Sequence, residues 1–398
     1  MRIALCSALY PTPKEPWVFG GAEMFLRQFA EGLAATGDDV IVIRIALDGT
    51  ARQEIANGVT VHFLPIRNLF PPFEANKNPL ARMAWHLIDD RGQASSLVRD
   101  VLKEFKPDVF HTHTLNGHNA DVWNVARALG IPIVHTLHDY YLICPKCTRF
   151  NAIEPCEHAC VACSLLTKKR RQRTRLIDAV TSVSRRTLDI HQSEGLFDST
   201  SSHVIHHVAN PAIRFEQPVP YEGVLKVGYI GRFAEEKGVQ RLIQAVGELP
   251  SEQLALKLAG SITAEDEARL RQLAPSANLQ FLGFVDPVEF YHDVHVCVAP
   301  SIWEEPAGLV ILDALAAGRP VIGSFRGGIS EGIENGVTGW IVQPTVEAIR
   351  DILAQLLSEP VLLSNANEVL ASRANTCRSF ADLLISYRSV YKTLMTTL

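Results

Sequence analysis

Short apolar runs alternate with amphipathic segments along almost the whole chain, and this alternation predicts strands separated by helices. In the first half, the runs that predict strands are residues 2–8, 39–46, 59–65, 108–113, 131–138, 179–184 and 203–208. The segments between them predict helices, among them residues 23–35, 80–104 and 118–129. Strands joined in this way favour an α/β fold with a mostly parallel sheet.

The periodicity stops at residues 210–223, which read NPAIRFEQPVPYEG and predict a linker rich in Pro, Gly and polar side chains. After the linker, strands are predicted at residues 224–231, 253–260, 278–284, 294–300, 320–324 and 338–342, and a long amphipathic helix at 376–395. We therefore expect two Rossmann-like domains, over residues 1–212 and 213–375. A final helix over 376–398 is expected to cross back to the first domain.

Length and composition agree with two domains and exclude several classes of protein. A chain of 398 residues is long for a single core. The net charge of −5 gives no basic footprint for nucleic acid. No apolar run approaches the roughly 20 residues that span a membrane, and the N-terminus is too short and too weakly basic for a signal peptide. We expect a cytoplasmic protein.

One stretch in the second half combines a helix start with two acids. Residues 301–318 read SIWEEPAGLVILDALAAG, follow a predicted strand and lead into a helix near Gly308. The unpaired N–H groups of Gly308, Leu309 and Val310 would form an anion site at that helix start. A helical rise of about 1.5 Å per residue places Glu305 and Asp313 roughly 10 Å or more apart.

That separation exceeds the roughly 5–9.5 Å between two carboxyl groups that act on one glycosidic bond. The two acids therefore fit opposite ends of one ligand better than a catalytic pair. A solvated helix start with incidental acids explains the spacing about equally well.

Three further segments carry candidate chemistry. GYIGRFAEEKG places Arg232 and Lys237 after the first strand of the second half, where an Arg fork and a Lys charge suit a diphosphate. Gly20 and Gly21 precede the first helix and permit close backbone approach, and His138 ends a buried strand. A charged surface loop and a structural histidine are the plain alternatives. Neither half carries G-x-G-x-x-G after its first strand, which argues against a dinucleotide oxidoreductase.

These elements occur in the order seen in one enzyme family. GGAE after the first strand, HDYYLICP, GRFAEEKG, EEPAGLVILDALAAGRPVI and GGISEGIENGVTGWIV resemble the retaining nucleotide-sugar glycosyltransferases of the GT-B type, family 4. The resemblance covers essentially the whole chain. It implies two Rossmann-like domains that face each other across a cleft, a nucleotide diphosphate sugar as donor, and no catalytic metal.

The resemblance also implies roles for the candidate residues. Arg232 and Lys237 would neutralise the diphosphate together with the backbone at Gly308, Leu309 and Val310. Glu305 matches the first Glu of the family's E-x7-E motif and would contact the transferred sugar. Asp313 stands where the family usually has a second Glu for the ribose, one methylene shorter. Gly20 and Gly21 would adjoin the diphosphate, and His138 the sugar C6 and the reaction centre.

The implied activity is transfer of a hexose from a UDP- or GDP-sugar to a glycan, lipid-linked or small-molecule acceptor in polysaccharide or glycoconjugate biosynthesis. Departure of the nucleoside diphosphate develops negative charge that Arg232, Lys237 and the helix start would stabilise. Two alternatives remain open, namely another GT-B enzyme such as a 2-epimerase, and a sugar-nucleotide-binding protein without activity, which the Asp at 313 motivates.

Five cysteines gather between residues 144 and 163. Cys144 and Cys147 form one C-x2-C pair and Cys160 and Cys163 another, a spacing that predicts a structural zinc site with Cys156 or His158 as alternative ligands. Reduced thiols or a disulfide are the alternatives.

A basic segment follows the cysteines. Residues 168–175 carry six cations, which predict either a membrane-facing helix at the inner membrane or a solvated basic face.

Overall fold

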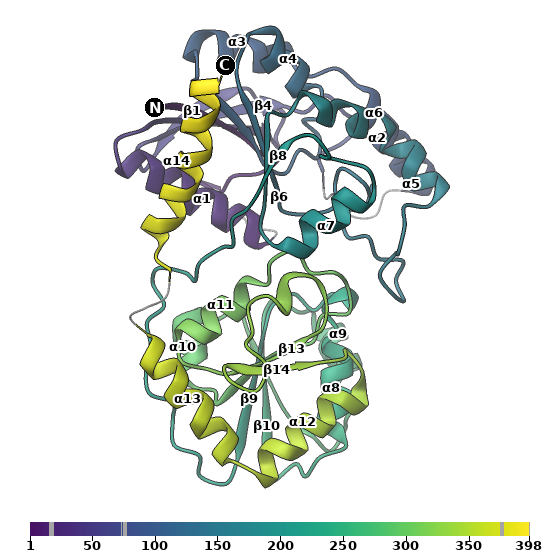
Figure 1. Ribbon diagram of the computed structural model, residues 1–398. Helices are drawn as coiled ribbons and strands as arrows, with labels where there is room; N and C mark the ends of the chain where they lie inside the picture. Colours follow the sequence, from purple (N-terminus) through teal and green to yellow (C-terminus); the bar gives the residue numbers. More distant parts are fainter. Residues whose placement is uncertain (16–19, 73, 75–77, 375–377, 398) are drawn as a thin grey trace. The chain divides into compact units, whose positions relative to one another are not determined.

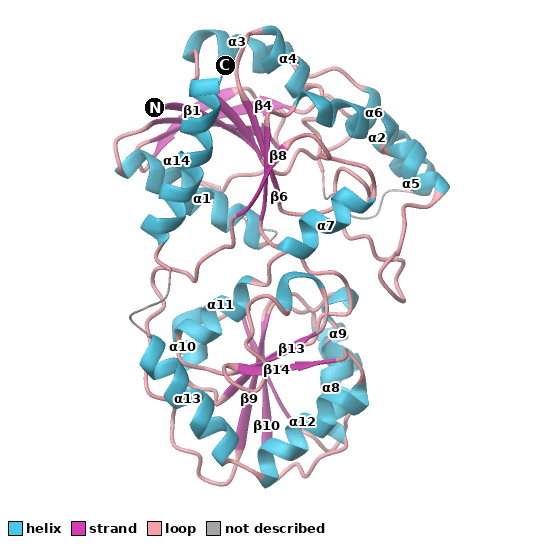
Figure 2. Ribbon diagram, viewed as in Figure 1, coloured by secondary structure: helices cyan, strands magenta, loops and turns pink. Residues whose placement is uncertain are grey.

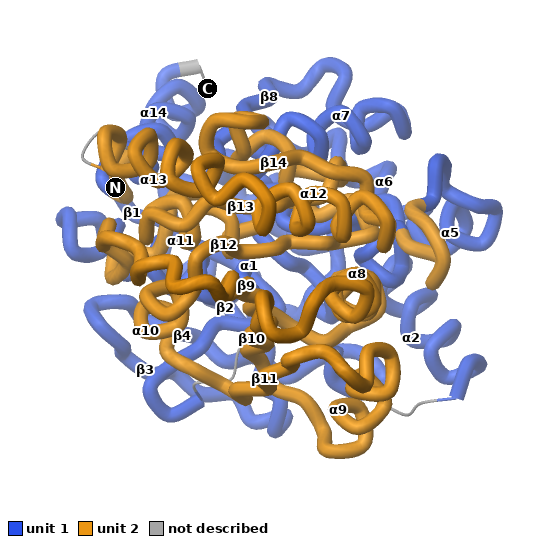
Figure 3. The backbone as a smooth tube through the Cα atoms, turned by 90° about the horizontal axis from the view of Figure 1, so that it is seen from below, with its two compact units in different colours: residues 1–149, 156–206, 381–398 blue, residues 150–155, 207–380 orange. Residues whose placement is uncertain are grey.

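The computed structural model describes residues 1–15, 20–72, 74, 78–374 and 378–397, and they divide into two compact units (Figure 3). Unit 1 comprises Met1–Arg149, Cys156–His206 and Ala381–Leu398, and unit 2 comprises Phe150–Pro155 and His207–Phe380. Within the ranges just given, no helix combines the length and apolarity needed to cross a lipid bilayer.

Unit 1 is built on an eight-stranded sheet with the order β3-β4-β2-β1-β5-β6-β7-β8. All neighbours are parallel except β3 and β4. The strands are β1 (Arg2–Cys6), β2 (Asp39–Ala46), β3 (Arg52–Ala56), β4 (Val59–Pro65), β5 (Val109–Thr112), β6 (Ile133–Leu137), β7 (Ala179–Ser182) and β8 (Ser201–Val204). Each predicted strand of the first half is thus present. Strand β3 was not predicted, because it is an edge strand whose residues RQEIA lack a continuous apolar run.

The helices of unit 1 lie on both faces of this sheet (Figures 1 and 2). They are α1 (Gly21–Ala35), α2 (Pro79–Arg91), α3 (Ser96–Phe105), α4 (Val122–Ala128), α5 (Val161–Leu166), α6 (Lys168–Arg173) and α7 (Arg185–Ser193), with a 3-10 turn at Thr174–Leu176.

The helix predicted over residues 80–104 is wrong, because α2 and α3 are separate. Gly92 is extended and caps α2, where a side chain would meet the Ile88 carbonyl oxygen at 2.5 Å. Ser95 then starts α3 by accepting the Leu97 N–H.

The last helix, α14 (Phe380–Thr397), packs on unit 1. Arg388 forms an ion pair with Asp38 in the loop before β2, and the Tyr391 hydroxyl lies 2.6 Å from Nδ1 of His111 on β5. The start of this helix was predicted at residue 376. Residues 376 and 377 lie outside the described ranges.

Unit 2 is built on a six-stranded, fully parallel sheet with the order β11-β10-β9-β12-β13-β14. Its strands are β9 (Leu225–Ile230), β10 (Leu254–Ala259), β11 (Asn278–Gly283), β12 (Val296–Ala299), β13 (Val321–Ser324) and β14 (Gly339–Val342). Counted within unit 2 this is the 3-2-1-4-5-6 order of a Rossmann fold. Sequence periodicity predicted all six strands.

Helices cover both faces of this second sheet (Figure 2). They are α8 (Val239–Gly247), α9 (Ala264–Arg271), α10 (Pro287–His292), α11 (Leu309–Ala316), α12 (Val346–Ser358) and α13 (Val361–Arg373), with 3-10 turns at Glu235–Lys237 and Gly327–Ile329. Each face has its own apolar cluster, one centred on Val227, Leu256 and Leu353 and the other on Ala299, Ile311 and Val321. The sheet is therefore buried on both sides, which leaves the strand ends as the place for chemistry.

Candidate functional site

The strand order of unit 2 reverses between β9 and β12, and open α/β sheets bind ligands at the carboxyl ends of such strands. Arg232 and Lys237 follow β9, while Ser301 to Glu305 follow β12. The sequence-predicted donor residues of the second half are therefore brought together at this point by topology.

Lys237 and Glu305 form an ion pair at the centre of the site. The Lys237 Nζ lies 2.6 and 2.7 Å from the two carboxylate oxygens of Glu305. The same carboxylate accepts hydrogen bonds from Ser301 Oγ at 2.9 Å and from Trp303 Nε1 at 3.1 Å. Burial raises the pKa of Glu305, but the Lys237 charge and these hydrogen bonds outweigh it and hold the pKa below its usual value. Glu305 is thus an oriented carboxylate at neutral pH.

Arg232 stands at the edge of this site. Its side chain is 56% exposed and pairs with Glu236 at 3.2 Å.

Gly238, which follows Lys237 and caps α8 at φ 71°, lets the loop after β9 approach the end of β12 closely. A side chain there would meet the Pro300 carbonyl oxygen at 2.1 Å. The close approach brings the loop after β9 against the loop after β12, and so holds Lys237 on Glu305.

The helix predicted near Gly308 begins at Leu309 as α11, with Gly308 at φ 70° as its N-cap. The first N–H groups of a helix have no acceptor within it, so those of Leu309 and Val310 are available to an anion. Because Gly308 has no side chain, a ligand can approach the backbone at the N-terminus of α11. The helix start and Lys237 place positive potential at the same strand ends.

Asp313 lies in the middle of α11, and its Oδ1 accepts the backbone N–H of Asn210 at 2.7 Å. Burial raises the pKa of Asp313 to about 6. Asp313 therefore contacts Asn210 at the start of the linker in this structure. One carboxylate oxygen is committed to that contact.

Sequence reasoning assigned no role to the glycines of the GGISEG segment, yet they hold the loop of Glu305. Gly327 at φ 57° donates its N–H to Glu304 Oε2, and Gly328 donates to the Glu305 carbonyl oxygen at 2.7 Å. A side chain at Gly327 would lie 2.0 Å from that same carbonyl oxygen. Ser301 and Trp303 were also missed as partners of Glu305. A GG pair after a strand was the available signal, but it does not say what the backbone contacts.

In unit 1, the paired glycines precede and begin α1. Gly20 caps the helix with extended backbone and Gly21 is its first, exposed residue. Among the residues that the structure describes, a side chain at Gly20 would meet only Glu23 Oε2, at an ordinary 3.6 Å. The described residues thus leave room for a side chain at position 20. A ligand that approaches the backbone stays our prediction for this glycine.

His138 follows β6 at the carboxyl edge of the first sheet, as predicted. Its Nε2 lies 2.9 Å from Nδ1 of His113, which follows β5, and its ring contacts Phe25 on α1 with centroids 5.4 Å apart. Desolvation of the buried carboxyl group raises the pKa of the adjacent Asp139 to about 7. A histidine and a weakly acidic carboxyl group thus share this edge.

The zinc site of Cys144, Cys147, Cys160 and Cys163 stays a prediction that this structure does not show. Across the described ranges, no group of three or more His, Cys, Asp or Glu side chains is arranged to hold a metal ion, so the alternative ligands Cys156 and His158 do not complete one either. A structural zinc needs four ligands converging on one point. In this structure the half-buried Cys147 thiol accepts a hydrogen bond from Asn116 at 3.0 Å, while Cys160 is exposed and caps α5 by accepting the Cys163 N–H. The described cysteines are free thiols.

Half of the six cations in the basic segment 168–175 are paired with acids of unit 1. Arg170 is fully buried beside Asp89 and Asp90. Arg171 pairs with Glu194 and Arg173 with Asp121. The three other cations, Lys168, Lys169 and Arg175, are exposed. Contact of this segment with a membrane stays a prediction, now resting on three cations rather than six.

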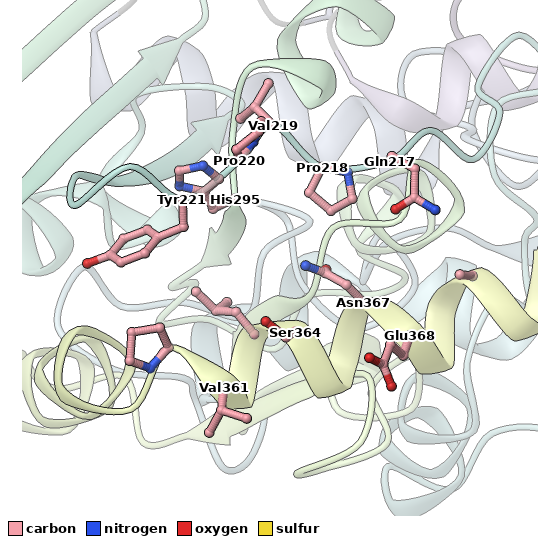
Figure 4. Close-up of a pocket in the computed structure, with 13 residues that line it drawn as sticks. Gln217, Pro218, Val219, Pro220, Tyr221, His295, Val361, Ser364, Asn367 and Glu368 are labelled. Carbon is pink, nitrogen blue, oxygen red and sulfur yellow. The ribbon is translucent and has the colours of Figure 1, made fainter.

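Unit 2 also contains a cavity of about 430 Å³ (Figure 4). The linker segment Gln217–Tyr221 forms one wall and α13 the other, with His295 between Tyr221 and Val219. None of the predicted donor residues lines it. This cavity is separate from the strand ends that carry Lys237 and Glu305.

Two family models match the chain in succession. The model for Glycosyltransferase Family 4 matches residues 19–212, and the model for Glycosyl transferases group 1 matches residues 212–375. Together they span nearly all of both units. The chain therefore belongs to the group 1 glycosyltransferases and is a glycosyltransferase.

Relatives and solved structures agree with this assignment. The chain is 29% identical over 333 residues to a 42.6 kDa protein in the cps region of Klebsiella pneumoniae, covering 83% of this chain and 87% of that protein. It resembles the solved sucrose-phosphate synthase of Thermosynechococcus elongatus with a TM-score of 0.75 at 20% identity over 100% of both chains. It resembles Anabaena HepE, solved with UDP-glucose, with a TM-score of 0.69 at 17% identity, again over both full chains. These likenesses identify the fold as GT-B.

Proposed function

We propose that the chain is a retaining hexosyltransferase that uses a nucleotide diphosphate sugar, a UDP- or GDP-sugar, as donor. The observation that carries this proposal is the Lys237–Glu305 pair beside the start of α11, at the strand reversal of unit 2. Lys237 and the start of α11 suit the phosphates, and Glu305 suits the sugar hydroxyls. The UDP-glucose complex of HepE supports a UDP-sugar as the first donor to test.

The phosphate end of the donor would meet three sources of positive charge. Lys237 supplies a cation, Arg232 supplies a flexible guanidinium, and Gly308, Leu309 and Val310 supply backbone N–H groups. When the bond between the sugar C1 and the phosphate oxygen breaks, negative charge develops on that oxygen. Cations and N–H groups that already point at this oxygen stabilise the charge without having to reorganise.

The sugar end would be held by Glu305. Its carboxylate is locked by Ser301 and Trp303, so it can accept hydrogen bonds from the hexose hydroxyls in one orientation. Asp313 would hold the ribose through the oxygen that does not bind Asn210. On this proposal the linker contact and the ribose contact share one carboxylate.

Retention follows from attack on the face that the phosphate leaves. The acceptor hydroxyl forms its bond to C1 on that face, and its proton passes to the departing phosphate oxygen. Glu305 and Asp313 are then binding groups and no nucleophile is required. His138 would contact the hexose, and the backbone of Gly20 and Gly21 would adjoin the phosphates.

The acceptor is proposed to be a glycan, a lipid-linked saccharide or a small molecule. The relative in the cps region supports a role in polysaccharide or glycoconjugate biosynthesis.

The decisive test combines donor binding with transfer. Thermal shift across UDP-, GDP- and ADP-sugars should identify one donor that raises the melting temperature, since ligands stabilise the native state by mass action. Turnover of that donor should fall by at least about 100-fold in Lys237→Ala, as for loss of one group that stabilises the transition state. It should fall by about 100-fold in Glu305→Ala, because the hexose is then misplaced. Unchanged turnover would overturn the site. Release of a free 2-epimerised sugar would point to the epimerase, and donor binding without any turnover to a binding protein.

A further inference from the structure

Two histidines meet at the carboxyl edge of the first sheet. His113 follows β5 and His138 follows the neighbouring strand β6. Nδ1 of His113 lies 2.9 Å from Nε2 of His138, and their rings stack with centroids 5.1 Å apart and planes inclined by 27°. Of the two rings, His113 is the more enclosed, at 3% exposure.

His113 is itself held by a buried array. The ring of His111 lies 4.1 Å from it, centroid to centroid, because alternate residues of a strand share a face. His111 in turn contacts Thr136 Oγ1 at 2.7 Å through Nε2 and the Tyr391 hydroxyl at 2.6 Å through Nδ1. Phe29 of α1 packs edge-on against both histidine rings.

This array has little freedom to rearrange. Burial lowers the pKa of His111 well below its ordinary value, so His111 is neutral at pH 7. Strands β5 and β6 and helices α1 and α14 each fix one side of the array. His113 therefore presents its Nδ1 to His138 from a rigid support.

We propose that His113 is a positioning residue that sets the ring orientation and the tautomer of His138. Two neutral imidazoles share only one hydrogen along a contact between two ring nitrogens, so one nitrogen donates and the other accepts. The protonation of Nε2 in His138 is thereby tied to that of Nδ1 in His113. This inference rests on the proposed function, in which His138 adjoins the transferred sugar.

Substitutions at His113 can separate shape from hydrogen bonding. Asn places its amide group near the position of Nδ1, Gln places it near Nε2, and Leu fills the space with no polar atom. Because Nδ1 makes the contact, Asn should retain function and Gln should not. His191→Leu is the matched control, since His191 is fully buried on α7 and bonds to the Thr187 carbonyl oxygen.

Activity gives the first readout. His113→Leu and His113→Gln should lower kcat by about 10- to 100-fold, the cost of a misplaced active-site group. His113→Asn should stay within about 5-fold of the parent, and the donor KM should change by less than about 3-fold in all three. In a His138→Ala background, the His113→Leu loss should disappear, because coupled groups are not additive.

A spectroscopic readout does not depend on turnover. In protein labelled with ¹⁵N-histidine, the ring nitrogen shifts of His138 report its tautomer. They should change in His113→Leu and return in His113→Asn, while His191→Leu leaves them in place.

The outcomes separate the two proposals. If the His138 shifts are the same in the parent and in His113→Leu, the positioning role is wrong, whatever the activity. If the shifts change but His138→Ala retains full turnover, the positioning role stands and the proposed role of His138 fails. Equal losses in Asn, Gln and Leu would show that ring shape rather than the Nδ1 contact matters, and would overturn the inference.

Discussion

Lys237 and Glu305 lie 68 positions apart in the chain, yet Nζ of the lysine is within 2.7 Å of both oxygens of the carboxylate. Both side chains are largely enclosed, with 20% and 14% exposure. Replacement of Lys237 by Met should leave the Glu305 charge poorly compensated. We expect a loss of roughly 1.5–3 kcal/mol in the free energy of unfolding, the range for hydrogen bonds to charged groups. Urea unfolding at pH 7 measures it.

The double variant Lys237→Met/Glu305→Gln should be more stable than Lys237→Met alone, because it removes the unpaired charge. Lys226→Met is the matched control. Lys226 pairs with Asp293 at 3.2 Å on a more exposed surface, where a pair contributes about 0–1 kcal/mol. Equal effects of the two lysine substitutions would contradict this interpretation.

Gly327 and Gly336 provide a matched pair of glycines with positive φ, at 57° and 76°. A side chain at Gly336 meets nothing within 4 Å, so Gly336→Ala should cost about 1–2 kcal/mol from backbone strain alone. A side chain at Gly327 would lie 2.0 Å from the Glu305 carbonyl oxygen and must displace that loop. Gly327→Ala should therefore cost more stability and also abolish the thermal shift by the donor, which Gly336→Ala should retain.

The raised pKa of Asp313 makes stability depend on pH in a defined direction. Its native pKa of about 6 exceeds the unfolded value of about 3.9, so the native state binds more protons between these values. Stability contributed by this group is thus present below about pH 4 and lost as pH rises toward 6.

Asp313→Asn keeps an oxygen for the Asn210 N–H and removes the charge. We expect it to raise the free energy of unfolding at pH 7.5 by about 1–2 kcal/mol, and by less than half of that at pH 4. Urea unfolding at both pH values is the measurement. An equal effect at both would mean that the carboxyl group titrates normally. If Asp313 also holds the ribose, the same variant should weaken donor binding.

The Tyr391 hydroxyl fixes α14 to β5 through His111. Tyr391→Phe should cost about 1–3 kcal/mol, because it leaves a buried imidazole nitrogen without its partner. Tyr10→Phe is the control. Tyr10 is equally buried, but its hydroxyl has no hydrogen-bond partner among the described residues. Its loss should change the unfolding free energy by less than about 0.5 kcal/mol, and a larger cost for Tyr10→Phe would refute the assignment.

Thiol reactivity tests whether the cysteine cluster holds free thiols or the predicted zinc. The hydrogen bond from the Cys163 N–H lowers the pKa of the exposed Cys160, so its thiol should react rapidly with iodoacetamide. Desolvation raises the pKa of Cys147 and that of Cys6, so both should react slowly. Mass spectrometry of the labelled peptides resolves the sites. Protection of Cys144, Cys147, Cys160 and Cys163 together, released by a chelator, would support the zinc site.

Periodicity predicted most of the fold because parallel sheets buried on both faces need continuous apolar runs. Each of the strands 39–46 and 59–65 has the observed bounds. The edge strand β3 was missed because only one of its faces is covered. The break at Gly92 was missed because a single glycine does not by itself interrupt an amphipathic helical pattern. The candidate donor residues were found from motifs that lie next to predicted strand ends.

The sequence by itself determined every strand but β3, most of the helices and the residue types at their ends, since these depend on local propensity and burial. Only the tertiary structure decided which of those ends meet. It placed Lys237 on Glu305, took Asp313 to the linker, and brought Asn116 to the Cys147 thiol. It also joined His113 to His138 and α14 to β5. Such contacts join residues far apart in the chain, and their geometry follows from packing, which no local pattern encodes.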